Sequence, residues 1–79
     1  YSRKGDFDRA ISDYTRALEI HPGGYLAYNN RGAAYSQKGD FDRAIADFDK
    51  ALAIKPDFQG ARDNRDRAYK MKTGSGEGS

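Results

Sequence analysis

Apolar side chains return along this chain at intervals that match the turn of a helix. In the first third of the chain they lie at Ala10, Ile11, Tyr14, Ala17 and Leu18. The same spacing returns later, at Ala44, Ile45, Phe48, Ala51 and Leu52. Positions spaced in this way fall on one face of an α-helix, whereas one face of a strand takes every second residue. Both segments are therefore predicted to be amphipathic helices with one apolar stripe each.

The two segments belong to a unit that repeats every 34 residues. The sequence YSRKGDFDRAI, from Tyr1 to Ile11, returns with a single substitution from Tyr35 to Ile45. A weaker match at the same offset pairs Ala27, Asn30, Arg31, Ala34, Tyr35 and Lys38 with Ala61, Asn64, Arg65, Ala68, Tyr69 and Lys72. A fixed period of this length is typical of stacked helical repeats. We expect a repeat domain over 1–72, with the second helix of one repeat in 1–22, a complete repeat in 25–58, and the first helix of the next repeat in 57–72.

Proline and glycine set the expected ends of the helices. Pro22 and Pro56 should end the two amphipathic helices, because the residue before a proline is driven out of helical geometry. Gly5 and Gly39 are expected to form the turns between paired helices, in the left-handed conformation that glycine adopts readily. The predicted helices cover 6–20, 24–38, 40–54 and 57–72. The Gly- and Ser-rich residues 73–79 are expected to be a flexible tail.

Two Asp-Phe-Asp triplets precede the amphipathic stripes, and they have two interpretations. Asp6 and Asp40 are placed to cap the free N–H groups of a first helical turn, and Asp8 and Asp42 add negative charge near the positive end of the helix dipole. A calcium-binding loop would need further ligands and a glycine at its bend, and the sequence lacks both. Capping also explains why the triplet repeats. We expect no metal and no cofactor.

Small residues stand where two helices of one repeat are expected to touch. Gly32 and Ala44 leave room for a close approach of the two backbones, and Tyr35 and Phe48 fill the space around them. Asp66 occupies the position of Gly32 in the last partial repeat. Because no partner helix follows there, this carboxylate is expected to face solvent, and the last helix should resemble a polar cap.

These residues resemble the tetratricopeptide repeat family. The family pattern, W-x2-L-G-x2-Y…A-x3-F…P over 34 residues, appears here as Tyr28-x2-Arg31-Gly32-x2-Tyr35…Ala44-x3-Phe48…Pro56. Tyr28 replaces the family's Trp, and Arg31 replaces its Leu. The resemblance covers 1–72. It implies an all-α fold whose four helices form antiparallel helix–turn–helix hairpins, stacked as a frame-shifted fragment of about two repeats of a right-handed α-solenoid.

The same resemblance implies a scaffold for protein–protein interaction rather than an enzyme. In this family the first helix of each repeat lines a concave groove that receives a peptide or a partner helix. The corresponding positions, in the helices 24–38 and 57–72, are Leu26, Asn29, Asn30, Ala33, Gln37, Gly60, Asp63, Asn64, Arg67 and Lys70. They recur every three or four residues and so share a face, and the Asn amides both donate and accept hydrogen bonds. The alternative, that these are ordinary solvated positions, stays open.

One subclass of the family is disfavoured. Co-chaperone members hold the C-terminal carboxylate of a heat-shock chaperone with a clamp of Lys, Asn and Arg. Asn30 matches one clamp Asn, but Gly60 and Asn64 stand where the last helix would supply the clamp Lys and Arg. We therefore do not expect the chain to bind a chaperone tail, and its protein or peptide partner stays unidentified.

Other functional classes find little support in the composition. His21 is the only histidine, and no Ser, Cys or Asp constellation surrounds it to make it a catalytic base. Fourteen basic residues are balanced by twelve acidic ones, which does not favour nucleic-acid binding. No apolar run approaches the roughly 20 residues that span a membrane. Without a leader-like segment a cytoplasmic location is expected, and the start at Tyr1 is typical of a natural or engineered fragment.

Self-association is the alternative function. The helix 6–20 lacks the first helix of its own repeat, and the helix 57–72 lacks its second. The uncovered side chains are expected to be Ala10, Tyr14 and Ala17 on the former, and Ala61, Ala68 and Tyr69 on the latter. Two copies brought head to tail would complete the missing pair, as a possible homo-oligomer. Asp66 should oppose this contact, because we expect it to face Ala10, and burying an unpaired carboxylate is unfavourable.

Overall fold

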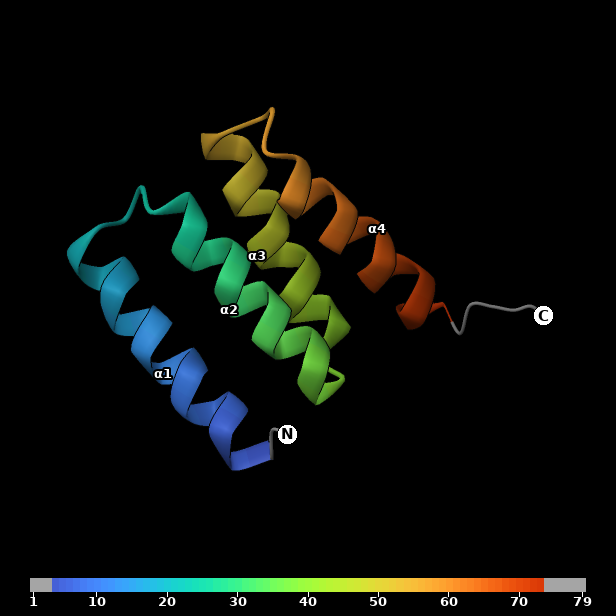
Figure 1. Cartoon of the computed structure of the whole chain (residues 1–79), viewed down its shortest axis with the longest axis horizontal. Helices are drawn as coiled ribbons and strands as arrows, with labels where there is room; N and C mark the ends of the chain where they lie inside the picture. The colour runs from blue at the N-terminus through green and yellow to red at the C-terminus, as the bar shows by residue number, and fades with distance from the viewer. Residues whose placement is uncertain (1–3, 74–79) are drawn as a thin grey trace.

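The computed structural model describes residues 4–73, which form four α-helices joined by short turns. In chain order these are α1 (Lys4–Ile20), α2 (Tyr25–Lys38), α3 (Phe41–Ile54) and α4 (Gln59–Lys72). No strand occurs within this part of the chain. Successive helices run antiparallel, and α1 and α4 form the two outer edges of the array (Figure 1). The expected all-α fold of helical hairpins is confirmed, and each helix begins and ends within two residues of its predicted bounds.

The turn between α2 and α3 has the predicted geometry. Gly39 has φ 90°, and its N–H donates to the carbonyl of Ser36, so the left-handed glycine ends α2. The carboxylate of Asp40 then accepts a hydrogen bond from the backbone N–H of Arg43, at 3.4 Å, and caps α3. Asp42 lies in the first turn of α3, as expected.

The corresponding triplet in α1 behaves differently, and three expectations there are wrong. Gly5 lies inside α1 rather than in a turn, because glycine permits a left-handed turn but does not impose one. Asp6 consequently lies within the first turn of α1 and not at its N-cap. Asp8 lies beyond that turn, and its carboxylate instead pairs with Lys38 of α2. The predicted tail, apart from Thr73, lies outside the described residues.

The core is centred on the contact between α2 and α3, where Gly32 faces Phe48. A Cβ atom added to Gly32 would lie 2.6 Å from Cε1 of Phe48, so only glycine fits this position without a shift of the ring. Phe48 is 1% exposed. The residue opposite Gly32 is therefore Phe48 rather than the expected Ala44. Ala44 is also fully buried, in a cluster with Ile45, Phe48 and Ala68, against which Tyr35 and Phe41 pack.

Polar contacts between neighbouring helices repeat with the same offset as the sequence. Between α1 and α2 they are Lys38 with Asp8, and Arg31 with Thr15 at 3.2 Å. Between α3 and α4 they are Lys72 with Asp42 at 2.7 Å, and Arg65 with Asp49 at 2.9 Å. Each residue of the second set lies 34 positions after its counterpart in the first. Helix α4 therefore sits on α3 in the same register in which α2 sits on α1.

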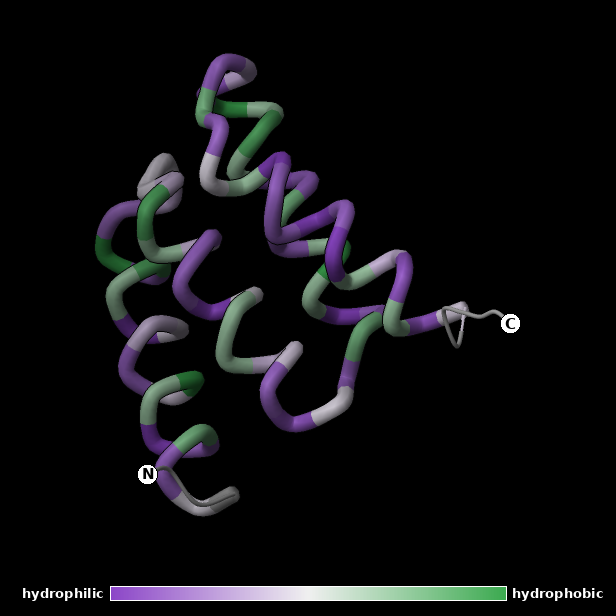
Figure 2. Tube along the Cα trace, turned by 45° about the vertical axis from the view of Figure 1, so that its right-hand side comes forward, coloured by the Kyte–Doolittle hydropathy of each residue, from purple (hydrophilic) through white to green (hydrophobic). Residues whose placement is uncertain are grey.

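The last helix is the most polar of the four, as the predominantly hydrophilic trace that leads to the C-terminus in Figure 2 shows. Its buried residues are the two alanines Ala61 and Ala68, which pack inward, whereas Asp66 on another face is exposed. The expectation that Asp66 meets solvent is thus confirmed. This polarity lets α4 end the described array without leaving a large apolar surface uncovered.

Candidate functional site

A hollow of about 360 Å³ lies between α2 and α4, the two helices predicted to line the groove. Its lining is Ala33, Ser36 and Gln37 from α2, Phe48 from α3, and Asn64, Arg67, Ala68 and Met71 from α4. The floor is apolar, because Phe48 lies beneath the two walls. The rim is polar and carries one charge, the guanidinium of Arg67. We call this site the α2–α4 hollow.

Two of the predicted groove amides meet at this site and bridge its walls. Nδ2 of Asn64 donates to Oδ1 of Asn29 across the two helices, at 3.0 Å. Nη1 of Arg67 donates to Oδ1 of Asn64, at 3.4 Å. These bonds leave the amide NH₂ of Asn29 and the remaining guanidinium N–H groups of Arg67 able to donate to a bound chain. The amides therefore fix the spacing of the walls as well as offering polar groups.

The structure brings together only part of the predicted groove. Ala33, Gln37, Asn64 and Arg67 line the α2–α4 hollow, and Asn29 joins them through Asn64. The other predicted side chains lie elsewhere: Leu26 and Lys70 are exposed outside the lining, Asp63 accepts a hydrogen bond from Gln59, and Asn30 faces α1. Ser36, Phe48, Ala68 and Met71 also line the hollow but were not predicted as groove residues. The 34-residue offset could have located Met71, because it corresponds to the predicted groove residue Gln37.

A second hollow, of about 300 Å³, lies between α1 and α2. It is lined by Asp6, Phe7, Ala10, Tyr14, Asn30, Ala33, Ala34 and Gln37. Five of these, from Tyr14 to Gln37, lie 34 positions before Phe48, Asn64, Arg67, Ala68 and Met71 of the α2–α4 hollow. The α1–α2 hollow is thus a copy of the first one in which one helical wall is absent from the described residues.

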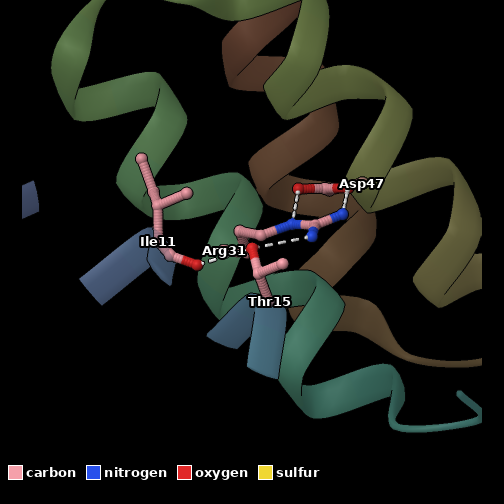
Figure 3. Close-up of polar contacts among 4 residues, drawn as sticks. All are labelled: Ile11, Thr15, Arg31 and Asp47. Carbon is pink, nitrogen blue, oxygen red and sulfur yellow. Dashed lines mark hydrogen bonds and ion pairs between the residues drawn. The ribbon is translucent and has the colours of Figure 1, made fainter. Parts of the chain in front are cut away.

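A network centred on Arg31 ties three helices together (Figure 3). Its Nε and Nη2 donate to the two carboxylate oxygens of Asp47 in α3, at 2.8 and 2.7 Å. Its Nη1 donates to the hydroxyl of Thr15 in α1, which in turn donates to the carbonyl of Ile11, at 2.7 Å. The hydrogen bond with Asp47 raises the pKa of Arg31 above its ordinary value.

This network is structural rather than catalytic. Asp47 is 5% exposed and is fully engaged by a planar, bidentate partner, which is the strongest form of this ion pair. The family pattern has a leucine at the position of Arg31, so the pattern alone does not predict the partner Asp47. The signal was present in the repeat, because Arg31 and Asp47 recur as Arg65 and, one unit earlier, as Asp13.

The side chains predicted to support self-association divide into two groups. Ala10, Tyr14 and Ala17 are half-buried on α1, and Tyr69 is 46% exposed on α4. Ala61 and Ala68 are at most 1% exposed, because α4 turns both of them inward. The expectation that these two alanines lie partly open is therefore wrong, and any contact on the outer face of α4 must use other residues.

Neither metal chemistry nor a membrane span is indicated by the described residues. Within 4–73, no three His, Cys, Asp or Glu side chains gather in a way that could hold a metal ion. His21 is exposed in the turn that follows α1. None of the four described helices is long and apolar enough to cross a bilayer.

Comparison with known families supports the interpretation of the fold. A family model described as tetratricopeptide repeat matches residues 25–58, and a second, described as TPR repeat, matches residues 1–39. No curated protein matches the chain. The two family matches together cover residues 1–58, including the Gly32–Phe48 contact and the Arg31 network. The chain therefore belongs to the tetratricopeptide repeat family.

Proposed function

We propose that the chain is a non-catalytic scaffold that holds a peptide or partner helix in the α2–α4 hollow. Tetratricopeptide repeats mediate protein–protein interaction. The observation that carries the proposal is the hollow itself, which combines an apolar floor with a polar rim on the face made by the two first helices. Pockets that bind specifically share this combination, because apolar contact supplies affinity and placed polar groups supply orientation.

The lining favours one kind of ligand segment. The volume of about 360 Å³ suits a single large apolar side chain, which would rest on Phe48, Ala68 and Met71. Arg67 is the only charged residue of the lining, so an acidic group next to that side chain is favoured over a basic one. The free N–H groups of Asn29 and Arg67 are positioned to donate to the backbone carbonyls of the bound segment.

Selection from a random peptide library, followed by two-dimensional NMR titration of the isotope-labelled chain, tests this function. We expect enriched peptides to pair an apolar residue with an acidic one and to shift the amide signals of Ala33, Asn64 and Met71. Arg67→Glu should weaken binding about tenfold or more, because it reverses the charge at the rim. Arg62→Glu is the matched control, since Arg62 is exposed on α4 and outside the lining.

Two outcomes would contradict the proposal. One is a set of enriched peptides whose signals map to the exposed face of α3 and leave the hollow unchanged. The other is an equal loss of affinity in Arg67→Glu and Arg62→Glu, which would show that binding follows the overall charge of α4 rather than the rim of the hollow.

A further inference from the structure

Arg65 carries a buried donor that lacks a partner. Its Nε atom is shielded from solvent and makes no hydrogen bond within the described part of the chain. In the complete repeat, the equivalent atom of Arg31 donates to Asp47 on the second helix of the same repeat. The contact with the preceding helix is present in both repeats: Arg65 donates a hydrogen bond to Asp49, as Arg31 donates one to Thr15. The interaction that α4 lacks is therefore the one with a carboxylate on a following second helix.

Helix α1 carries the matching carboxylate. Asp13 lies 34 positions before Asp47, and the segment Tyr1–Ile11 that leads to it differs from Tyr35–Ile45 at one position only. Asp13 is exposed, and the structure shows no hydrogen bond or ion pair for it among residues 4–73. One end of the array thus presents an unmatched donor and the other end an unmatched acceptor, in the same register of the repeat.

We propose that a second copy of this chain docks its α1 on the outer face of α4, as α3 packs on α2 within the chain. Asp13 of the second copy then accepts the hydrogen bond from Nε of Arg65. The occupant is another copy rather than an unrelated helix because α1 is a near-duplicate of α3, the helix that fills the equivalent place. This inference does not depend on peptide binding in the α2–α4 hollow.

Two further contacts of the complete repeat have counterparts at this junction. The guanidinium of Arg43 lies 5.9 Å from the ring centre of Tyr35, and at the junction Arg9 of the second copy would lie over Tyr69. Asn64 donates to Asn29, and at the junction Asn30 of the second copy would donate to the carboxylate of Asp63. The first contact thus keeps a cation over an aromatic ring, and the second keeps a hydrogen-bond donor opposite an acceptor. Docking would also cover Tyr69, one of the two large apolar side chains that α4 leaves exposed.

Asp66 is the one misfit in this arrangement. It stands in the place of Gly32, where a Cβ would come within 2.6 Å of the Phe48 ring. At the junction the ring opposite is that of Tyr14 from the second copy, and not Ala10 as the sequence suggested. The Tyr14 ring must therefore shift before the copies can close, so Asp66 weakens the contact. The contact is also heterologous, so it adds copies in a row rather than closing as a dimer.

Sedimentation equilibrium over a hundredfold range of concentration tests the junction with the full 79-residue chain. Asp66→Gly should tighten association about tenfold or more, because it restores the space into which the Tyr14 ring of the second copy would pack. Adding Asp13→Asn to Asp66→Gly should remove most of that gain. Adding Glu19→Gln is the matched control: it removes the same charge from α1 at a position whose equivalent on α3, Ala53, is exposed. It should leave the gain intact.

Circular dichroism shows whether each variant is folded, because a glycine within α4 lowers its intrinsic helix stability. If Asp66→Gly unfolds α4, Asp66→Ala takes its place, with a smaller expected gain. The proposal is overturned if the folded Asp66 variant has the mass of one chain at every concentration. It is equally overturned if association rises but Asp13→Asn and Glu19→Gln change the association constant by the same amount. A third contrary result is an Asp66→Gly chain that melts at a higher temperature with no change in mass, which would mean that α4 is covered within one chain.

Discussion

Arg31 and Arg65 occupy the same position in successive repeats, and the difference between them shows what the complete repeat provides. Arg31 lies between two helices and uses three nitrogens, two on Asp47 and one on Thr15. Among residues 4–73, Arg65 has only the preceding helix beside it and uses one nitrogen, on Asp49, while its Nε has no partner there. The first helix of a repeat is therefore fully satisfied only when the second helix of the same repeat covers it.

The aromatic positions show the same contrast. Phe48 is enclosed by α2 and α4, whereas its equivalent Tyr14 borders the open α1–α2 hollow and is half-buried. Both residues occupy the same sequence motif, so the motif alone does not determine burial. What determines it is whether the neighbouring first helix is present, which makes stability in this chain a property of helix pairs rather than of single helices.

The largest predicted loss of stability is at these two aromatic positions, and it should differ between them. Phe48→Ala should lower the free energy of unfolding by about 3–5 kcal/mol, since it empties a fully enclosed site. Tyr14→Ala should cost less than about half as much, because its ring packs on one side only. Chemical denaturation of both variants measures the difference at low concentration, where copies are separate. Equal losses would show that burial at the two positions does not differ.

A smaller effect is expected at the two equivalent aspartates. Asp47→Ala leaves the half-buried guanidinium of Arg31 without its bidentate partner and should cost about 2–4 kcal/mol. Asp13→Ala should change the stability of the single chain by less than about 0.5 kcal/mol, because Asp13 is exposed. Thermal melts of the two variants give the comparison. If Asp13→Ala destabilises the dilute chain as strongly as Asp47→Ala, then Asp13 has a partner within the chain.

The smallest effect concerns the ion pairs at the helix ends. Lys38→Met removes the pair with Asp8, which is half exposed, and should cost roughly 0.2–1 kcal/mol. The loss should shrink at high salt, because exposed ion pairs are screened. Lys50→Met, at an exposed position on α3, is the control and should have no such salt dependence. A loss that is independent of salt would mean that the stem of Lys38, rather than its charge, supplies the contact.

The helices were predictable because their signals are local, whereas the site depended on partners far apart in sequence. Spacing, prolines and Gly39 located all four helices, since each signal acts within one or two turns. Gly5 carried the same local signal as Gly39 and yet lies within a helix, because no local rule forces glycine to turn. The burial of Ala61 and Ala68 depends on which face α4 turns toward α3. The 34-residue offset implies that orientation, but the two alanines alone do not reveal it.

The pairing of Arg31 with Asp47 spans 16 residues and two helices, so periodicity within either helix contains no trace of it. Likewise, Phe48 was predicted as core and also forms the floor of the α2–α4 hollow, because a buried ring can present one edge to a cavity. Four of the ten predicted groove residues, Ala33, Gln37, Asn64 and Arg67, line the α2–α4 hollow because the first helices do face it, whereas Asn30 lines the hollow beside α1.

The central claim, that completing a repeat satisfies the arginine of its first helix, is tested most directly by the side-chain Nε–H signals of Arg31 and Arg65 in nitrogen-detected NMR. In dilute solution we expect the Arg31 proton to be protected from exchange with solvent and the Arg65 proton to exchange at least about tenfold faster, because within the described part of the chain only the former is hydrogen-bonded. In concentrated Asp66→Gly the Arg65 proton should gain protection, and Asp13→Asn should abolish that gain. Equal exchange of the two protons in the dilute chain would contradict the account.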